Sequence, residues 1–261
     1  MILAKEFNRS SQARDSDFST NARDTPTIVQ FGASSPVELG RAAALVQPYV
    51  AGVDLNCGCP QSWASQDGIG AILMRDRAAV GEMVRAVKAS CGTDFCVSVK
   101  IRIHKDLRET VDFVRTIEAA GADFLTVHAR THHQRSNTPP LHEATKLVKE
   151  TVNVPVVANG DVFGLADARR FAQASGADGV MAARGLMENP ALFAGYLHTP
   201  IEAVEKFMQY AVRSPLPHKL LLHHLSEMTG NLLSKKQRVQ MLENRDTLAL
   251  IDWLRANKML N

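Results

Sequence analysis

Apolar residues along the 261-residue chain follow two different spacings. Short runs rich in Val, Ile and Leu have the length and composition of buried strands. These runs are residues 27–31, 53–55, 95–103, 123–127, 154–158 and 178–182. Between them, apolar positions recur every three or four residues, as on amphipathic helices. The helical segments are residues 36–46, 77–89, 107–120, 141–151 and 165–175. Strands that alternate with helices predict an α/β domain with a parallel sheet.

The polar residues near the strand ends favour a closed barrel over an open doubly wound sheet. Chemically active side chains gather at the end of one predicted strand after another. They lie at residues 56–59, 100–102, 128–130, 159–161 and 184. A (β/α)8 barrel builds its active site from many strand ends, whereas an open sheet concentrates ligands at one crevice. The Gly68-Ile69-Gly70 segment is a poor dinucleotide fingerprint because it lacks the third glycine.

The number of strands predicts a TIM barrel that is incomplete at its N-terminal end. Six complete strands are visible, and the last two lead into Asn159-Gly160-Asp161 and Ala183-Arg184-Gly185. These two segments resemble the phosphate site that usually follows strands seven and eight of a barrel. The missing strands then lie upstream. Residues 1–4 would be the end of strand two, and strand one would be absent.

From residue 200 onward only helical spacing occurs. The apolar positions are Val204, Phe207, Ala211, Leu222, Leu225, Met228, Val239, Leu242, Leu248, Ile251 and Leu254. We therefore predict two domains, a barrel over residues 1–198 and a small all-α domain over residues 199–261.

Composition and charge narrow the class of protein. With 45% hydrophobic and 22% charged residues, the chain is neither disordered nor a coiled coil. The net charge of +3 lies in residues 200–261, where nine Lys and Arg face six Asp and Glu, so an anionic partner is allowed. No apolar stretch approaches the ~18 residues of a membrane span. Four cysteines are too few for a disulfide scaffold, which predicts a cytoplasmic protein without a membrane anchor.

One cysteine stands out as a chemical group. Asp54-Leu55-Asn56-Cys57-Gly58-Cys59-Pro60 carries a strand into a glycine turn that presents a thiol at the barrel mouth. Such a thiol can act as a nucleophile, a general acid or a metal ligand. Zinc is disfavoured because Cys-x-Cys is a poor chelating spacing, so we expect no metal. We interpret Cys57, Cys91 and Cys96 as small apolar fillers and Cys59 as the functional thiol.

Together with four later segments, this motif resembles the signature of the tRNA-dihydrouridine synthases. The later segments are Val99-Lys100-Ile101-Arg102, Val127-His128-Ala129-Arg130-Thr131, Ala158-Asn159-Gly160-Asp161, and Ala183-Arg184-Gly185 with Asn189-Pro190. The resemblance covers essentially the whole chain and is strongest to the branch that acts on positions 20a and 20b of the tRNA D-loop. The family has an FMN-binding barrel followed by a helical RNA-binding domain, which agrees with the two predicted domains.

The resemblance implies that NADPH, or NADH, reduces FMN, and that the flavin passes hydride to C6 of a uracil in tRNA. Cys59 matches the cysteine that protonates C5, and Asn56 would bind the uracil edge. Lys100 would place a cation beside the flavin, and Gln30 would meet its pyrimidine edge. The remaining cofactor residues implied are His128, Asn159, Gly160, Asp161, Ala183 and Arg184. Arg102 and Arg130 are candidate substrate-binding residues. They would either bind RNA phosphate groups or form ion pairs with acidic side chains in the barrel.

Two further clusters have simpler alternatives. His132, His133 and His142 lie in or beside a polar loop, which favours solvated histidines over a metal site. Lys235-Lys236-Gln237-Arg238 either grips the tRNA backbone or is an ordinary solvated helix face. We expect a monomer that binds tRNA.

Two other functions stay open. A free-pyrimidine FMN oxidoreductase of the dihydroorotate dehydrogenase type would share the barrel and the flavin but would not need the basic helical tail. A non-catalytic truncated isoform with RNA affinity is the other. It is favoured by the lack of a counterpart to the Pro-Met segment on the family's first strand, whose backbone touches the flavin.

Overall fold

A computed structural model of the chain describes residues 1–260 and divides into two compact units. The first unit consists of residues 1–160 and 171–181, and the second of residues 161–170 and 182–261. The predicted domain boundary between residues 198 and 199 stays a prediction. Within residues 1–260, no helix combines the length and the apolar character that crossing a bilayer requires.

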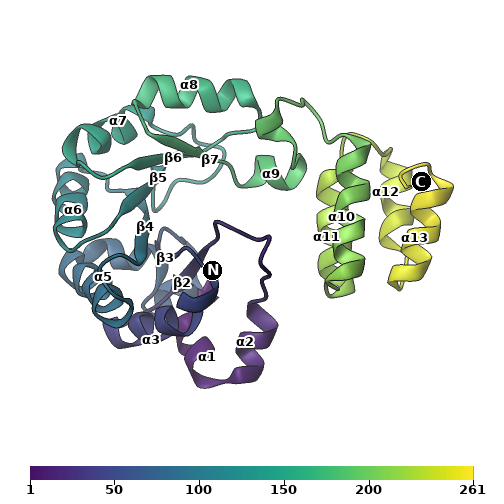
Figure 1. The fold of residues 1–261 in the computed structure, drawn as a ribbon. Helices are drawn as coiled ribbons and strands as arrows, with labels where there is room; N and C mark the ends of the chain where they lie inside the picture. Colours follow the sequence, from purple (N-terminus) through teal and green to yellow (C-terminus); the bar gives the residue numbers. More distant parts are fainter. Residues whose placement is uncertain (261) are drawn as a thin grey trace. The chain divides into compact units, whose positions relative to one another are not determined.

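The first unit is built on one parallel sheet. Its strands pair in chain order, each with the next, which makes the sheet seven-stranded over the described residues (Figure 1). They are β1 (Ile2–Leu3), β2 (Ile28–Gly32), β3 (Gly52–Cys57), β4 (Cys96–Ile103), β5 (Phe124–Thr131), β6 (Val156–Asn159) and β7 (Gly179–Met181). This order is that of a TIM-barrel wall. The α/β class, the parallel sheet and the six complete strands predicted are confirmed.

The N-terminal segment contributes a strand where the sequence predicted one. Ile2 and Leu3 of β1 pair in parallel with Phe31 and Gly32 of β2. Over the described residues the sheet therefore has seven strands, one fewer than a closed (β/α)8 barrel, and its order ends at β1 and β7.

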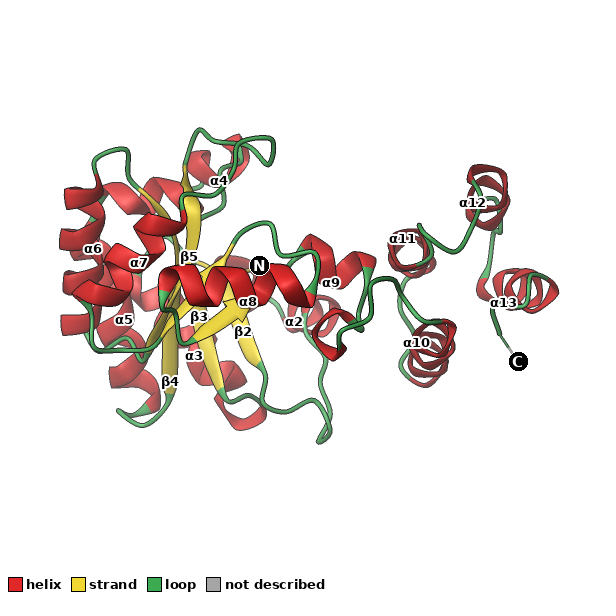
Figure 2. Cartoon of the chain, turned by 90° about the horizontal axis from the view of Figure 1, so that it is seen from above, coloured by secondary structure: helices red, strands yellow, loops and turns green. Residues whose placement is uncertain are grey.

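Helices connect the strands. They are α1 (Ala4–Arg9), α2 (Ser11–Asp17), α3 (Pro36–Val46), α4 (Ser62–Gln66), α5 (Arg77–Cys91), α6 (Leu107–Ala119), α7 (His142–Thr151) and α8 (Leu165–Ser175). Figure 2 shows α5, α6 and α7 outside the strands. Local capping starts several of them: the Asp76 side chain accepts from Ala79 N (3.0 Å) at α5, and Ser35 precedes Pro36 at α3.

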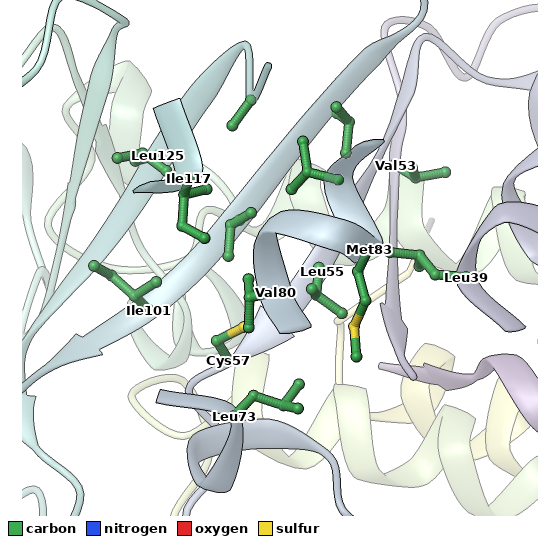
Figure 3. Packing of buried hydrophobic residues seen from close by; sticks show 14 of the residues in the cluster. Leu39, Val53, Leu55, Cys57, Leu73, Val80, Met83, Ile101, Ile117 and Leu125 are labelled. Atoms are coloured by element: carbon green, nitrogen blue, oxygen red, sulfur yellow. The ribbon is translucent and has the colours of Figure 1, made fainter. Parts of the chain in front are cut away.

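Alternation along β3, β4 and β5 separates an apolar outer face from a polar inner face. On β3, Val53, Leu55 and Cys57 are fully buried in the core that the sheet shares with the helices. Leu55 and Cys57 lie beside Val80 and Met83 of α5 (Figure 3). Because successive side chains of a strand point to opposite faces, the residues between these apolar positions face away from the helices. Cys57 is thus a core residue, as predicted.

Two strands extend further than the sequence predicted. Asn56 and Cys57 lie within β3, and His128 and Arg130 lie within β5. Gln30 lies in the middle of β2. The predicted strands 53–55 and 123–127 ended where polar residues began. This was wrong because polar side chains on the inner face of a barrel alternate with apolar ones without ending the strand.

The second unit is helical, as predicted from residue 200 onward. Its helices include α9 (Arg184–Glu188), α10 (Ile201–Arg213), α11 (His218–Met228), α12 (Lys235–Leu242) and α13 (Thr247–Ala256). An apolar cluster of its own joins α10 to α13. Its most deeply buried members are Val204, Met208, Leu221, Leu225, Met241, Leu250 and Leu254.

Candidate functional site

Two rows of polar side chains cross the inner face of β2, β3 and β4. The strand register aligns Gln30 with Asp54, and Asp54 with Ser98. One step along the same face, Asn56 is aligned with Lys100. Parallel register therefore gathers two amides, a hydroxyl, a carboxylate and a cation that are up to 70 residues apart in sequence.

The first row is a buried hydrogen-bond network centred on Asp54. Ser98 Oγ donates to Asp54 Oδ1 (2.7 Å), and Gln30 Nε2 donates to Asp54 Oδ2 (2.8 Å). Burial raises the pKa of the Asp54 carboxyl, and the hydrogen bonds from Ser98 and Gln30 and the nearby Lys100 charge oppose that rise. Asn56 extends the network, since its Nδ2 donates to Gln30 Oε1 (2.7 Å).

The loop that follows β3 carries Cys59 and is held by Asn56. The Asn56 Oδ1 atom accepts from the backbone N–H groups of Gly58 (3.0 Å) and Cys59 (2.9 Å). An Asn side chain that bonds to backbone two and three residues further on is a typical turn device. The Cys59 side chain is half-buried, in contrast to the fully buried Cys57.

Gly70 supports the Cys59 loop from the other side. Gly70 has φ of 73°, which favours glycine, and a Cβ there would lie 2.8 Å from Cys59 O and 2.9 Å from Cys59 Cβ. The neighbouring Ala71 N donates to Cys59 O (2.9 Å). The backbone of Cys59 is thus fixed on both sides by polar or steric contacts.

Lys100 is a largely buried cation on the inner face. Burial lowers its pKa from 10.5 to about 8, the Asp54 charge opposes that change, and the Arg102 charge adds to it. A lysine whose pKa lies so near neutrality is typical of a functional site. The predicted place of Lys100 beside the flavin stays a prediction.

Arg102 and Arg130 hold loops at this end of the sheet. Arg102 donates from Nε to Gly58 O (2.8 Å) and from Nη1 to Thr131 O (2.9 Å). It thereby ties the Cys59 loop to the end of β5. Arg130, fully buried, donates to the carbonyl oxygens of Thr138 and Ser136. Their predicted contact with substrate stays a prediction, since these guanidinium contacts are with backbone carbonyl groups.

His128 faces the same end of the sheet from β5. Its Nε2 lies 3.1 Å from Arg130 Nη1. A guanidinium only donates, so this ring nitrogen is the acceptor. Gly160 lies against the ring, because a Cβ on it would be 3.4 Å from His128 Cδ2, and its φ is 140°. Asn159 is buried, and its Nδ2 donates to Met181 O (2.9 Å).

The remaining predicted residues lie in the second unit. Arg184 Nη2 forms an ion pair with Asp161 Oδ1 (2.8 Å), and its guanidinium lies 5.0 Å from the centre of the Phe163 ring. Ala183 directly precedes α9. Within this unit the structure therefore brings Asp161 and Arg184 together, and their predicted contact with the cofactor stays a prediction.

Sequence analysis missed three residues of this arrangement: Asp54, Ser98 and Gly70. A signal for the first two was present. Asp54 and Asn56 on one strand, and Ser98 and Lys100 on another, repeat with the period of two that marks one face of a strand. Gly70 carried no such signal, because its role depends on how close Cys59 comes in space.

The histidine-rich loop contains a pair of rings. His132 and His133 have ring centres 4.9 Å apart, and burial together with the His133 charge lowers the pKa of His132. Among residues 1–260, no three His, Cys, Asp or Glu side chains are grouped as metal ligands would be. His142 instead stacks on Phe171, with ring centres 4.0 Å apart.

Comparison with known proteins gives a consistent result. The family described as Dihydrouridine synthase (Dus) matches residues 1–253. The chain is 48% identical over 255 residues to the tRNA-dihydrouridine(20a/20b) synthase of Schizosaccharomyces pombe, covering 97% of this chain and 77% of that protein. It is 44% identical to the tRNA-dihydrouridine(20a/20b) synthase [NAD(P)+]-like protein of Mus musculus, covering 97% of this chain and 78% of that protein. Against the Saccharomyces cerevisiae enzyme it is 43% identical, covering 97% and 70%.

Proposed function

This chain belongs to the dihydrouridine synthase family, and we propose that it reduces a uridine of tRNA to 5,6-dihydrouridine. The relatives reported above carry this activity, with positions 20a and 20b and with NAD(P)+, in their names. We extend the position, the nicotinamide reductant and FMN as the prosthetic group to this chain. The basic second unit, with exposed Lys235 and Lys236, would bind the tRNA backbone.

The donor set of the first unit fits a flavin ring. Lys100 supplies a cation, which would stabilise the negative charge of a reduced ring. Gln30 and His128 supply polar groups for the ring edges. When bound, FMN supplies the hydride for C6 of the uracil, and NADPH or NADH supplies the hydride to FMN.

The phosphate of the cofactor would bind to Arg184, which lies in the second unit together with Asp161 and Ala183. The predicted part of Asn159 and Gly160, two residues of the first unit, stays a prediction. A guanidinium is well suited to bind a phosphate through two parallel hydrogen bonds. Asp161 would orient Arg184 for this role, given their 2.8 Å ion pair.

Cys59 would donate the proton that completes the reduction. The uracil C5=C6 bond gains hydride at C6 and a proton at C5, so the thiol leaves the step as a thiolate and regains its proton from solvent. A cysteine thiol can act as a general acid. Because Cys59 is only half-buried, the uracil of the substrate can approach its thiol.

Asn56 would hold the uracil beside Cys59. Its Oδ1 is occupied by Gly58 and Cys59, and one hydrogen of Nδ2 is donated to Gln30. The second hydrogen of Nδ2 can therefore bind a carbonyl oxygen of the base. Because the target uracil belongs to a folded tRNA, it must leave its stack to reach this position.

The observation that carries the proposal is the hydrogen bond from Cys59 N to Asn56 Oδ1, because the register partner of Asn56 is Lys100. The test begins with the absorbance spectrum of the purified full chain between roughly 300 and 550 nm, where bound oxidised flavin absorbs. Dihydrouridine formed in tRNA by the FMN-loaded chain with NADPH is then measured by mass spectrometry. A folded chain that neither binds added FMN nor forms dihydrouridine would contradict the proposal and favour the non-catalytic alternative. A cytoplasmic location and a monomeric state stay predictions.

A further inference from the structure

Four side chains on the inner face of the sheet form one continuous chain of hydrogen bonds. In order they are Ser98, Asp54, Gln30 and Asn56, and the chain ends on the backbone of the Cys59 loop. We call this set the polar chain. The proposed function uses Gln30 and Asn56 directly, but it leaves the buried Asp54 without a role.

The polar chain has a direction that Asp54 determines. An ionised carboxylate only accepts hydrogen bonds, so Gln30 must turn its NH2 group toward Asp54. Its carbonyl oxygen then faces Asn56, which must donate in turn from Nδ2. This leaves the Asn56 Oδ1 atom facing the N–H groups of the Cys59 loop, the only end of that amide that can accept from them.

The opposite direction would release the loop. If Gln30 turned its oxygen toward residue 54, its NH2 group would face Asn56, and the Asn56 amide would have to turn as well. The Asn56 NH2 group would then face the N–H groups of Gly58 and Cys59, donor against donor, and both would lose their acceptor. A neutral amide at position 54 allows both directions, whereas a carboxylate allows one.

We propose that Asp54 is a positioning residue, which sets the direction of the polar chain and thereby holds the Cys59 loop in the conformation that presents the thiol. Its consequence for catalysis rests on the proposed function. Its consequence for the loop does not rest on the proposed function, because the contacts that fix Gly58 and Cys59 are made within the protein and need no cofactor or tRNA. Asp54 acts at a distance of two side chains and does not touch the reacting atoms.

Amide hydrogen exchange of Gly58 and Cys59 in the full chain without cofactor tests the proposal. Asp54→Asn makes both directions available, and we expect exchange of these two amides to become about tenfold faster. The double variant D54N/Q30E moves the carboxylate one position along the polar chain. The carboxylate at position 30 then only accepts, from the new amide at position 54 on one side and from Asn56 on the other, so slow exchange is expected to return.

Asp123→Asn is the matched control. Asp123 Oδ2 accepts from Val97 N at the start of β4, so this variant is expected to speed exchange at Val97 and leave Gly58 and Cys59 unchanged. Unchanged exchange at Gly58 and Cys59 in Asp54→Asn, or no recovery in the double variant, overturns the proposal. If Asp54→Asn does not fold, Gln30→Leu breaks the polar chain one link later. It must produce the same tenfold increase, and unchanged exchange in that folded variant overturns the proposal equally.

Turnover of tRNA by the FMN-loaded variants separates this inference from the proposed function. A positioning role predicts that Asp54→Asn lowers kcat about tenfold and leaves KM for tRNA within twofold. If the wild-type chain forms no dihydrouridine, the proposed function fails, whereas the exchange experiment still decides the role of Asp54.

Discussion

Asn56 on β3 and Lys100 on β4 are register partners in the parallel sheet, so an amide and a largely buried cation lie side by side on its inner face. Asn56 also holds the backbone of Cys59, three residues further on, through a hydrogen bond of 2.9 Å. One residue therefore links the thiol to the cation. This relation explains why the Asn-Cys-Gly-Cys segment and the distant Lys100 form one site.

Replacing Cys59 should remove activity without unfolding the protein. We expect Cys59→Ala to lower the rate of dihydrouridine formation by a factor of roughly 10² to 10⁴, the usual effect of losing a general acid. The side chain is half-buried and its thiol supports no core packing, so the melting temperature should stay close to wild type. Mass spectrometry of tRNA and thermal melts measure both quantities.

Cys57→Ala is the contrasting variant. Cys57 is fully buried in the core, so its truncation should cost about 1 kcal/mol of stability and leave FMN-loaded turnover nearly intact. Equal losses of activity in the two variants would argue against a special role for Cys59.

Lys100 should give the apoprotein a characteristic dependence of stability on pH. Its pKa is about 8 when folded and 10.5 when unfolded, so between these values the unfolded chain binds more protons. Stability therefore rises with pH across this window, by about 3 kcal/mol for this group. Urea unfolding from pH 7.5 to 10.5 measures the rise, which Lys100→Met should remove. Parallel curves for the two proteins would contradict the buried position of the charge.

Gly70 should be intolerant of any side chain. Its φ of 73° and the 2.8 Å approach of a Cβ to Cys59 O predict that Gly70→Ala displaces the Cys59 loop and lowers kcat at least tenfold. Gly92→Ala is the control, since Gly92 also has a positive φ, 93°, but open space around it. Both variants should lose stability in a urea titration, and only Gly70→Ala should lose kcat.

Arg184 should contribute to binding of the FMN phosphate. Arg184→Ala removes one charge-assisted contact with the phosphate, so we expect it to raise the Kd for FMN about tenfold. The quenching of flavin fluorescence on binding measures this Kd. Arg170→Ala removes another arginine that is paired with an aspartate, Asp167, and should leave FMN binding unchanged. Equal affinities for wild type and Arg184→Ala would place the phosphate elsewhere.

The α12 lysines should contribute to tRNA binding. Lys235 and Lys236 are exposed, whereas Gln237 caps the helix with Ser234, and Arg238 donates to Gly230 O (2.9 Å). Replacing both lysines by alanine should weaken tRNA binding and reduce the dependence of log K on log salt by between about 1 and 2.

Lys5→Ala with Lys146→Ala, two exposed lysines of the first unit, is the control pair and should leave the salt dependence unchanged. A wild-type chain that turns over a free pyrimidine as well as tRNA, with both rates unaffected by the α12 substitutions, would favour the free-pyrimidine alternative.

Much of the proposed site follows from local pattern. Cys59 was identifiable because a proline and glycines surround it, and Lys100 because a lysine on an apolar strand has few structural explanations. The strand ends were predicted too early, at residues 55 and 127, because a polar residue was taken to end a strand. On the inner face of a barrel, polar residues alternate with apolar ones instead.

The order of strands and helices, the all-helical C-terminal part and the family all follow from the sequence, since each depends on local spacing or on motifs of a few residues. Which distant residues meet depends on the tertiary structure. Gln30, Asp54 and Ser98 form one network only because parallel register aligns them, and Gly70 must be glycine only because Cys59 approaches it in space. Register and close approach depend on how separate segments pack, and no single segment of the sequence encodes them.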